Sequence, residues 1–420
     1  MLKKYTFLFC FFIAMTASLS AQTSEGCDGN RYFLDVFDNT TKTTVKFAEN
    51  RTGLGATQEL FMDIYEPMGD NLDKRPLIIW AFGGAFITGE RETMEQNCID
   101  FAKKGYVAAT IDYRLWNISL QGIPDSLDLL ESAVQATADL RAAVRFFRQD
   151  ADTDNLYNID TDFIFAGGVS AGAIAALNVA HLDDGDAIPD YLQTILDRNG
   201  GLEGDTGDST NLSYSSEVSA AINLSGGLHQ LKWLDDSDPP FISFHGDDDG
   251  TVPYLTDNAV VLGLTFLTVS GSGDLKGRAD AIGVDNYLYT VPGGGHENIY
   301  IDPAYAADRA EFYLNGHNFL HNVLCDNFVL DTESPELQTR LIGLSPNPAS
   351  EQILLDVGEQ AGAYDVQIFD QLGRMVQRFN NVRDRQLPLQ SSRIGKGMFI
   401  VRVDFRDQPY APVTRKILFH

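Results

Sequence analysis

The stretch FAGGVSAGAIAAL, residues 165–177, holds a single hydroxyl, that of Ser170, among glycines, alanines and aliphatic residues. The run FIFAGG that leads into Ser170 has the apolar character and the length of a buried strand, and AGAIAALNVAHL after it has the composition of a buried helix. Gly168 and Gly172, two residues to either side, leave room for a sharp change of direction. The stretch therefore predicts a buried strand, a tight turn at Ser170 and a helix whose partially positive N-terminus faces the hydroxyl.

Apolar runs of the same kind recur on both sides of this stretch. They are PLIIWAF (76–82), YVAATIDY (106–113), VSAAINLSGG (218–227), PPFISFHG (239–246) and NYLYTVPGG (286–294). Helical spacing of apolar residues marks TADLRAAVRFFR between the second run and Ser170. Buried strands that alternate with helices predict an α/β fold with a doubly wound, mostly parallel sheet. Ahead of them, RYFLDVF, TTVKFAE and ELFMDIYEP alternate as short antiparallel strands do.

The character of the chain changes after Cys325. Five short segments, QILLDV, YDVQIFD, MVQRF, MFIVRVDF and VTRKILF, follow one another at about ten-residue spacing with turn residues between them. They predict a small all-β sandwich over 343–420, joined by a polar linker over 326–342 to an α/β domain over 22–325. The two parts also differ in charge, because residues 341–420 carry ten Lys and Arg against eight Asp and Glu, whereas the whole chain has a formal charge of -28.

Within the α/β domain, residues 182–217 break the alternation of strands and helices. This segment is polar, acidic and rich in glycine. A long insertion in a compact domain is usually a binding element or a mobile cover over a site. We expect it to act as a lid and to form part of the substrate pocket wall.

The N-terminus, MLKKYTFLFCFFIAMTASLSAQ, has two lysines, an apolar run and then small residues. This layout predicts a secretory signal peptide over residues 1–21, and no other run is apolar for long enough to predict a transmembrane segment. The strong negative charge argues against nucleic acid as a partner.

Cys27, Cys98 and Cys325 remain after the signal, so one disulfide is expected. Cys27–Cys98 is the preferred pairing, but the alternatives stay open.

Ser170 needs a general base, because a hydroxyl is a weak nucleophile by itself. The base in turn needs an acidic residue that orients it. Downstream, HGDDDG places three aspartates, Asp247, Asp248 and Asp249, after a predicted strand. His296 lies in the glycine-rich loop VPGGGHENIY after the last predicted parallel strand. The order serine, acid, histidine predicts a triad of Ser170, one of the three aspartates, and His296. His245, directly after a strand, is expected to have a structural hydrogen-bonding role.

A third glycine-rich turn, IIWAFGGAF, lies upstream. Acyl transfer builds negative charge on the carbonyl oxygen, and backbone N–H groups placed there stabilise it. Gly84 and Ala85, together with Ala171 after the nucleophile, are the expected donors, with Gly83 as the alternative. No metal and no organic cofactor is expected for this chemistry.

GGAF, GVSAG, HGDDDGTVP and GGGH, in this order over about residues 45–325, resemble the α/β-hydrolase carboxylesterases, and in particular secreted bacterial esterases related to feruloyl and acetyl-xylan esterases. The resemblance implies that Asp249, the fourth residue after His245, is the acid of the triad. The chain departs from the family pattern at Phe82, where many relatives have histidine, and at Val169, where type-B relatives tend to have an acidic residue.

The C-terminal unit is similar to the sorting domain of the type IX (Por) secretion system. The similarity rests on LSPNPAS (344–350), FDQLGRMV (369–376), GKGMFIVRV (395–403) and the closing KILFH. It implies export through the periplasm to the outside or to the cell surface, with the type IX machinery as a partner and with the domain removed or used as an anchor. A carbohydrate-binding sandwich is the alternative.

Together these features predict a secreted serine hydrolase of carboxylic esters that works through an acyl-enzyme. The acyl and alcohol parts of the substrate are open between polymer-linked and small environmental esters. Two other functions fit parts of the pattern: a serine peptidase of the prolyl-oligopeptidase type, which shares the HG-x-x-D stretch, and a non-catalytic binding protein on a hydrolase fold.

Overall fold

The computed structural model describes residues 26–27, 31–207, 210–325, 342–357, 362–370, 374–406 and 413–420. The predicted signal peptide, residues 1–21, and almost all of the predicted linker lie outside the described residues.

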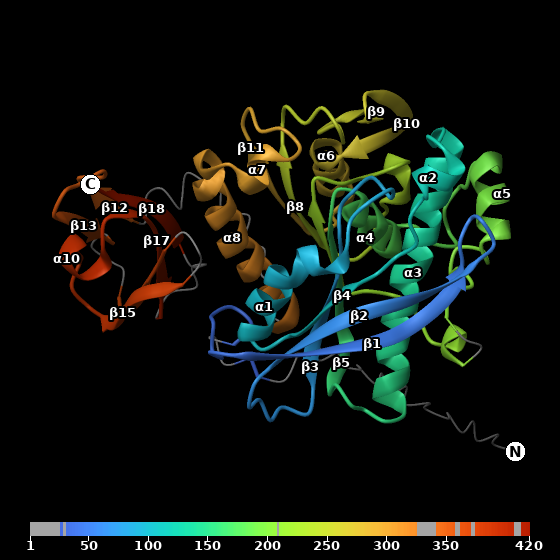
Figure 1. Cartoon of the computed structure of the whole chain (residues 1–420). Helices are drawn as coiled ribbons and strands as arrows, with labels where there is room; N and C mark the ends of the chain where they lie inside the picture. The colour runs from blue at the N-terminus through green and yellow to red at the C-terminus, as the bar shows by residue number, and fades with distance from the viewer. Residues whose placement is uncertain are drawn as a thin grey trace, which may run out of the picture.

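An eight-stranded sheet forms the centre of the larger domain (Figure 1). In spatial order its strands are β1 (Thr40–Arg51), β2 (Thr57–Pro67), β4 (Val107–Ile111), β3 (Arg75–Ala81), β5 (Ile159–Val169), β6 (Ala220–Leu224), β8 (Phe241–Gly246) and β11 (Asn286–Val291). The pairs from β4 to β11 are parallel, and β1, β2 and β4 pair antiparallel. The α/β-hydrolase fold class and all six parallel strands expected from apolar runs are confirmed.

Helices cover both faces of the sheet, which explains why β3, β4, β6 and β8 are buried at every residue. One face carries α1 (Glu95–Lys103) and α8 (Ala306–Cys325), and the other carries α3 (Ser126–Asp152), α4 (Ala171–His181) and α6 (Ser272–Ile282) (Figure 1). The shorter helices are α2 (Ile118–Gln121), α5 (Asp190–Arg198), α7 (Asn298–Ile301), η1 (Arg91–Met94), η2 (Asn211–Ser213), η3 (Leu231–Trp233) and η4 (Pro303–Tyr305). The carboxyl ends of the parallel strands meet at one edge, where ligands of open α/β sheets bind.

One element was not expected from the sequence, a hairpin of β9 (Thr256–Val261) and β10 (Leu264–Gly271) between β8 and α6. Its two-residue turn, Leu262 and Gly263, has φ of 53° and 75°, as in the turns that suit the twist of paired strands. β10 also pairs with the short β7 (Gly227–Leu228). We refer to these residues, 256–271, as the β9–β10 hairpin.

The stretch RYFLDVF, expected as the first strand, is instead turn and coil. Its apolar side chains pack without a partner strand, since Phe33 and Leu34 are buried in a small cluster with Ala310 and Leu314 of α8 and with residues of the C-terminal domain. Burial of the side chains, not strand pairing, thus accounts for the apolar alternation there.

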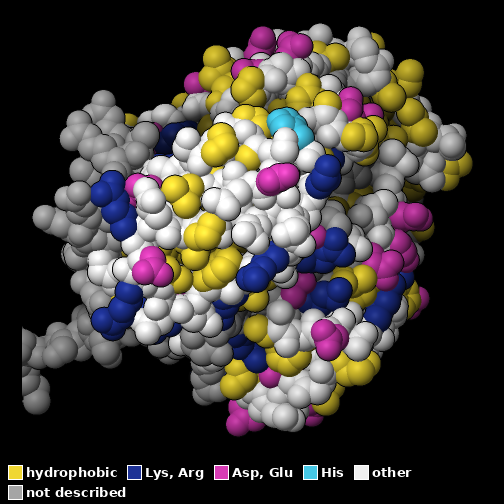
Figure 2. All heavy atoms as spheres, turned by 90° about the vertical axis from the view of Figure 1, so that its left-hand side faces the viewer, with side chains coloured by type: hydrophobic (Ala, Val, Ile, Leu, Met, Phe, Trp, Pro, Cys, Tyr) yellow, Lys and Arg dark blue, Asp and Glu magenta, His cyan; other side chains and the backbone are white. Residues whose placement is uncertain are grey.

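The C-terminal domain is all-β, as expected (Figure 1). One sheet has the order β12 (Gly343–Ser345), β13 (Gln352–Asp356), β16 (Gln386–Gln390), and the other has the order β15 (Met375–Val382), β14 (Tyr364–Phe369), β17 (Gly397–Phe405), β18 (Val413–Phe419), with a short helix α10 (Ser391–Ile394). All five expected strands are present, and β12 and β16 were missed. Basic and acidic side chains are interspersed on the face of the molecule shown in Figure 2.

A disulfide joins Cys27 to Cys325, so the preferred pairing of Cys27 with Cys98 is wrong. Cys98 has a free thiol and is fully buried on the core side of α1. Cys27 and Cys325 stand near the two ends of the α/β domain, 298 residues apart in sequence, and their Cα atoms are 5.6 Å apart. The bond therefore closes nearly the whole domain into one loop.

Candidate active site

Ser170 stands at the turn between β5 and α4 with φ of 54° and ψ of -116°, a conformation that non-glycine residues seldom adopt. The flanking glycines are required by close contacts. A Cβ atom at Gly172 would lie 2.1 Å from the carbonyl oxygen of Ala81, and one at Gly168 would lie 2.2 Å from the carbonyl carbon of Gly172. The turn therefore holds the Ser170 side chain at the carboxyl edge of the sheet, as the glycine pattern predicted.

The structure brings the three predicted triad residues together. His296 Nδ1 is 2.7 Å from Asp249 Oδ2, and His296 Nε2 is 2.8 Å from Ser170 Oγ. Because a carboxylate accepts hydrogen bonds, the imidazole proton lies on Nδ1 and Nε2 is left to accept the serine proton. This is the arrangement that a general base requires.

The three aspartates of HGDDDG have different surroundings. Asp249 is buried, and its second oxygen, Oδ1, accepts hydrogen bonds from the amides of Thr251 and Val252 at 2.8 and 3.0 Å. Asp247 instead accepts from the amide of Gly293 at 2.6 Å, and Asp248 is exposed. Of the three aspartates, Asp249 is the one that contacts His296. The structure thus distinguishes three residues of the same type that the sequence places side by side.

A second imidazole contacts the same carboxylate. His245 Nε2 is 3.1 Å from Asp249 Oδ2 and 3.0 Å from the carbonyl oxygen of Val252, so it donates from Nε2. Its other nitrogen is 2.8 Å from Ser272 Oγ, and the ring is fully buried. Burial by itself would raise the pKa of Asp249, but hydrogen bonds from His245 and His296 lower this pKa to about 2.

The sequence placed His245 in a structural role but did not reveal its contact with Asp249. The available signal was its position at the end of a strand, four residues before the aspartate across a turn. That spacing allows the two side chains to meet, but it also fits many loops in which they do not.

The loop after β3 lies beside Ser170, and Gly83, Gly84 and Ala85 line the same cavity. Among the residues that the structure describes, the amides of Gly84, Ala85 and Ala171 donate to no other protein group. The neighbouring Phe82, in the place of the relatives' histidine, stacks on Tyr113 at 4.1 Å between ring centroids, and its carbonyl oxygen accepts from the Tyr113 hydroxyl at 2.8 Å. The contacts with Tyr113 therefore anchor the loop. The N–H groups of Gly84 and Ala85 in the loop, and of Ala171 at the start of α4, stay available as hydrogen-bond donors.

Ser170 and His296 open into a cavity of about 760 Å³, which we call the reaction cavity. Two opposite kinds of surface line it. Val260, Val261 and Leu262 of the β9–β10 hairpin are apolar, whereas Thr93, Asn97, Tyr313 and Arg309 from η1, α1 and α8 are polar or charged.

The segment 182–217 does not form a wall of the reaction cavity, which corrects the expected lid. None of its described residues lines the cavity. It begins after the C-terminal end of α4, whereas Ser170 lies at the N-terminal end, and it packs along α3, where Glu203 pairs with Arg141 and Arg145. The β9–β10 hairpin takes the position instead because it follows the turn after β8, and this turn contains Asp249.

Within the described parts of the chain, no group of three or more His, Cys, Asp or Glu side chains is arranged to hold a metal ion. The same residues contain no helix that is both long and apolar enough to cross a membrane.

Two protein-family models match the chain. The BD-FAE model matches residues 62–229, which include Ser170 but end before Asp249 and His296. The model described as the secretion system C-terminal sorting domain matches residues 344–418. No curated protein matches the chain significantly.

Solved structures of an esterase from Thermogutta terrifontis are similar to this chain. Esterase 2 phosphorylated by paraoxon is 21% identical, with 68% of this chain and 95% of that chain covered and a TM-score of 0.49. The propionate-bound form is also 21% identical, with 67% and 95% covered and a TM-score of 0.47. From the two family matches and the observed sheet, the chain carries a BD-FAE domain, an esterase-like α/β-hydrolase domain, followed by a secretion system C-terminal sorting domain.

Proposed function

We propose that the protein is a serine carboxylesterase whose triad is Ser170, His296 and Asp249. The observation that carries this proposal is the continuous chain of hydrogen bonds from Asp249 through His296 to Ser170 at the reaction cavity. The available amides of Gly84, Ala85 and Ala171 beside Ser170 support it.

In the proposed reaction, Ser170 Oγ attacks the ester carbonyl carbon while His296 Nε2 takes the hydroxyl proton. The carbonyl oxygen becomes an oxyanion and accepts hydrogen bonds from the three amides. When the carbon–oxygen bond to the alcohol breaks, His296 returns the proton to the leaving oxygen. Water, deprotonated by His296, then attacks the acyl-enzyme. The bond between the acyl carbon and Ser170 Oγ breaks, His296 returns the proton to Oγ, and the carboxylic acid leaves. Asp249 accepts from Nδ1 throughout and stabilises the imidazolium.

The test is ester turnover by the purified protein on p-nitrophenyl acetate, butyrate and decanoate and on methyl ferulate. We expect turnover that Ser170→Ala lowers by more than a thousandfold, with little change in melting temperature. Residual activity above that level would refute the nucleophile. A folded protein that hydrolyses no ester would refute the esterase function, and prolyl peptides and ligand-binding assays would then test the two alternatives.

The substrate is proposed to be an extracellular ester, polymer-linked or small. The sorting domain indicates secretion or attachment at the cell surface through the type IX machinery, so substrates outside the cell are the accessible ones. Comparing kcat/KM across the p-nitrophenyl chain lengths and methyl ferulate measures which acyl group the reaction cavity accepts.

We further propose that residues 1–21 are a signal peptide, that 22–325 are the catalytic unit, and that 343–420 direct export. A protein of residues 22–330 should keep the full-length kcat/KM, and a chain without 343–420 should fail to reach the cell surface in a host with type IX secretion. Loss of turnover in the shorter protein would instead make the sandwich part of the active enzyme.

A further inference from the structure

One wall of the reaction cavity carries a positive charge. Arg309 and Tyr313 of α8 line the cavity together with Asn97 of α1. Residues four apart lie on the same face of a helix, so the two α8 side chains border the cavity side by side. We call Asn97, Arg309 and Tyr313 the polar wall.

The guanidinium of Arg309 is held at the polar wall by one of its terminal nitrogens. Nη1 donates to the carbonyl oxygens of Ile299 at 2.7 Å and of Asp302 at 3.0 Å, at the end of α7. Two residues between these, Tyr300 and Ile301, line the reaction cavity as well. The guanidinium is therefore fixed between two helices that both border the cavity.

The other nitrogens of this group have no partner within the described parts of the chain. There, Nε and Nη2 of Arg309 form no hydrogen bond and the group forms no ion pair, and both nitrogens keep accessible surface. Arg114, by contrast, pairs with Asp139 at 2.8 Å. The chain has 59 Asp and Glu against 31 Lys and Arg, so carboxylates are abundant. Arg309 nevertheless keeps its charge and two N–H donors available at the cavity.

The pKa of Tyr313 reports where this charge lies. Burial raises the pKa of the Tyr313 hydroxyl, and the Asp100 carboxylate adds to the rise. The Asn97 amide and the positive charge of Arg309 act in the opposite direction. An effect of this sign requires the guanidinium to lie near the hydroxyl, so the charge is on the face of α8 that borders the reaction cavity.

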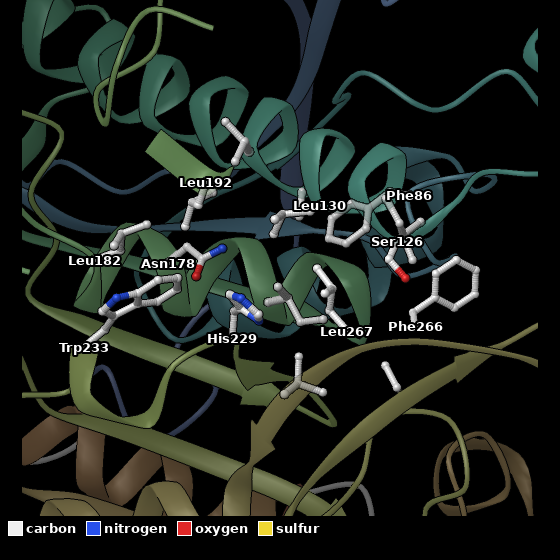
Figure 3. A pocket seen from close by; sticks show the side chains of 16 residues that line it. Phe86, Ser126, Leu130, Asn178, Leu182, Leu192, His229, Trp233, Phe266 and Leu267 are labelled. Atoms are coloured by element: carbon white, nitrogen blue, oxygen red, sulfur yellow. The ribbon is translucent and has the colours of Figure 1, made fainter. Parts of the chain in front are cut away.

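The β9–β10 hairpin offers no comparable charge. Val260, Val261 and Leu262 are its residues at the reaction cavity. Phe266 and Leu267 of the same hairpin line a separate pocket, whose described lining contains neither Lys nor Arg (Figure 3). A carboxylate placed against the hairpin would lose hydration without gaining a partner. An anionic substrate group is therefore favoured at the polar wall and not at the hairpin.

An acidic residue, Glu297, also lines the reaction cavity. Its side chain is exposed, whereas Arg309 is half-buried. Water screens an exposed charge more strongly than a half-buried one. The charge of Arg309 should therefore dominate the interaction with a substrate inside the cavity.

We propose that the reaction cavity selects esters that carry a second, ionised carboxylate, and that Arg309 binds this carboxylate through Nε and Nη2. A guanidinium and a carboxylate can form two parallel N–H···O bonds, which makes the pair both strong and directional. The apolar part of such an ester would contact the hairpin. This inference rests on the proposed esterase function and names its substrate class. The carboxylate can belong to the acyl part or to the alcohol part of the ester.

The experiment compares pairs of esters that differ in one charge, with the purified protein at pH 8. Monomethyl glutarate and its terminal amide place the group on the acyl part, and 4-acetoxybenzoate and 4-acetoxybenzamide place it on the alcohol part. We expect kcat/KM for the carboxylate to exceed that for the amide at least tenfold in one pair, mainly through a lower KM. The pair that shows this preference identifies the part that carries the carboxylate.

The reference substrate is p-nitrophenyl butyrate, which has no carboxylate. Turnover of this ester without a preference for the carboxylate in either pair would refute the inference and leave the esterase function standing. Absence of turnover on every ester would refute both.

Substitutions of Arg309 assign the preference to this side chain. Arg309→Gln should reduce the carboxylate-to-amide ratio of kcat/KM to less than about threefold, and Arg309→Lys, which keeps the charge but not the paired N–H groups, should keep part of it. Arg278→Gln is the matched control, because Arg278 also donates to a backbone carbonyl oxygen, that of Leu234, but does not line the reaction cavity. A ratio taken within one variant cancels a general loss of activity. An unchanged ratio in Arg309→Gln would overturn the assignment.

The acidic residue of the cavity tests the sign of the effect. Glu297→Gln removes the opposing charge, so the carboxylate-to-amide ratio should rise about two- to threefold. A lower ratio in this variant would contradict the electrostatic account.

Discussion

Two acidic loops of this protein look alike in sequence but have opposite electrostatics. One is HGDDDG, residues 245–250, and the other is DDGD, residues 183–186. In the first, Asp249 accepts from two imidazoles and two backbone amides, and its pKa falls to about 2 although burial by itself would raise it.

In the second loop, burial raises the pKa of Asp186 to about 6, and the neighbouring carboxylates of Asp183, Asp235 and Asp238 add to the rise. The amide of Asp183, at 3.2 Å, opposes it. The comparison shows that the donors and charges around a carboxylate, not the run of aspartates that contains it, decide whether its pKa rises or falls.

The largest effect should come from removing the charge of Asp249. Asp249→Asn should lower kcat/KM by about 10⁴-fold, because a neutral amide no longer holds the His296 tautomer or stabilises its cation. Asp248→Asn, one residue away and exposed, is the matched control and should change kcat/KM less than threefold. Steady-state kinetics on p-nitrophenyl butyrate measures both, and the opposite order would move the acid to Asp248.

A second variant removes one hydrogen-bond donor, His245, from Asp249, so that the first loop has fewer donors and becomes more like the second. His245→Leu should lower kcat/KM by about 10–100-fold, since a hydrogen bond to a charged group contributes about 1.5–3 kcal/mol. It should also raise the pKa of Asp249, because one of the two side-chain hydrogen bonds that oppose the effect of burial is removed. His245→Gln keeps a side-chain N–H and should recover part of the activity. Equal activity in His245→Leu and His245→Gln would argue that His245 acts only through packing.

A smaller effect is expected at Asp247, which connects its loop to the loop of His296 through the Gly293 amide. Asp247→Asn keeps an accepting oxygen but loses the charge, so kcat/KM should fall about three- to tenfold. Asp247→Ala removes the acceptor and should lose more. Equal kinetics for both variants and the wild type would mean that this contact does not position His296.

The smallest effect concerns stability and belongs to the second loop. The folded state binds the Asp186 proton more tightly than the unfolded state, so this group's contribution to stability is complete at low pH. It is lost as pH rises from about 4 through about 6. Asp186→Asn should therefore raise the melting temperature at pH 8 and leave it nearly unchanged at pH 3.5. Asp184→Asn on the same loop is the control, and the same shift at both pH values would contradict the assignment.

Much of the fold was predictable because its signals are local. Continuous apolar runs identified all six parallel strands. The glycines around Ser170 predicted the tight turn, in which Gly168 and Gly172 have no room for a side chain. Short alternating segments identified the sandwich. Where alternation reflected burial in an irregular segment, as at Phe33 and Leu34, the same signal produced a strand that does not exist.

The sequence by itself thus determined the α/β class, the position of the turn at Ser170, and a short set of candidates for its partners. The tertiary structure decided which aspartate meets His296, that His245 shares it, and that the β9–β10 hairpin, not residues 182–217, walls the reaction cavity. It also decided that Cys27 pairs with Cys325. Strand and turn signals depend on neighbouring residues. The contacts of Asp249 with His296 and of Cys27 with Cys325 instead join segments tens to hundreds of residues apart, and their distances exist only after the sheet has assembled.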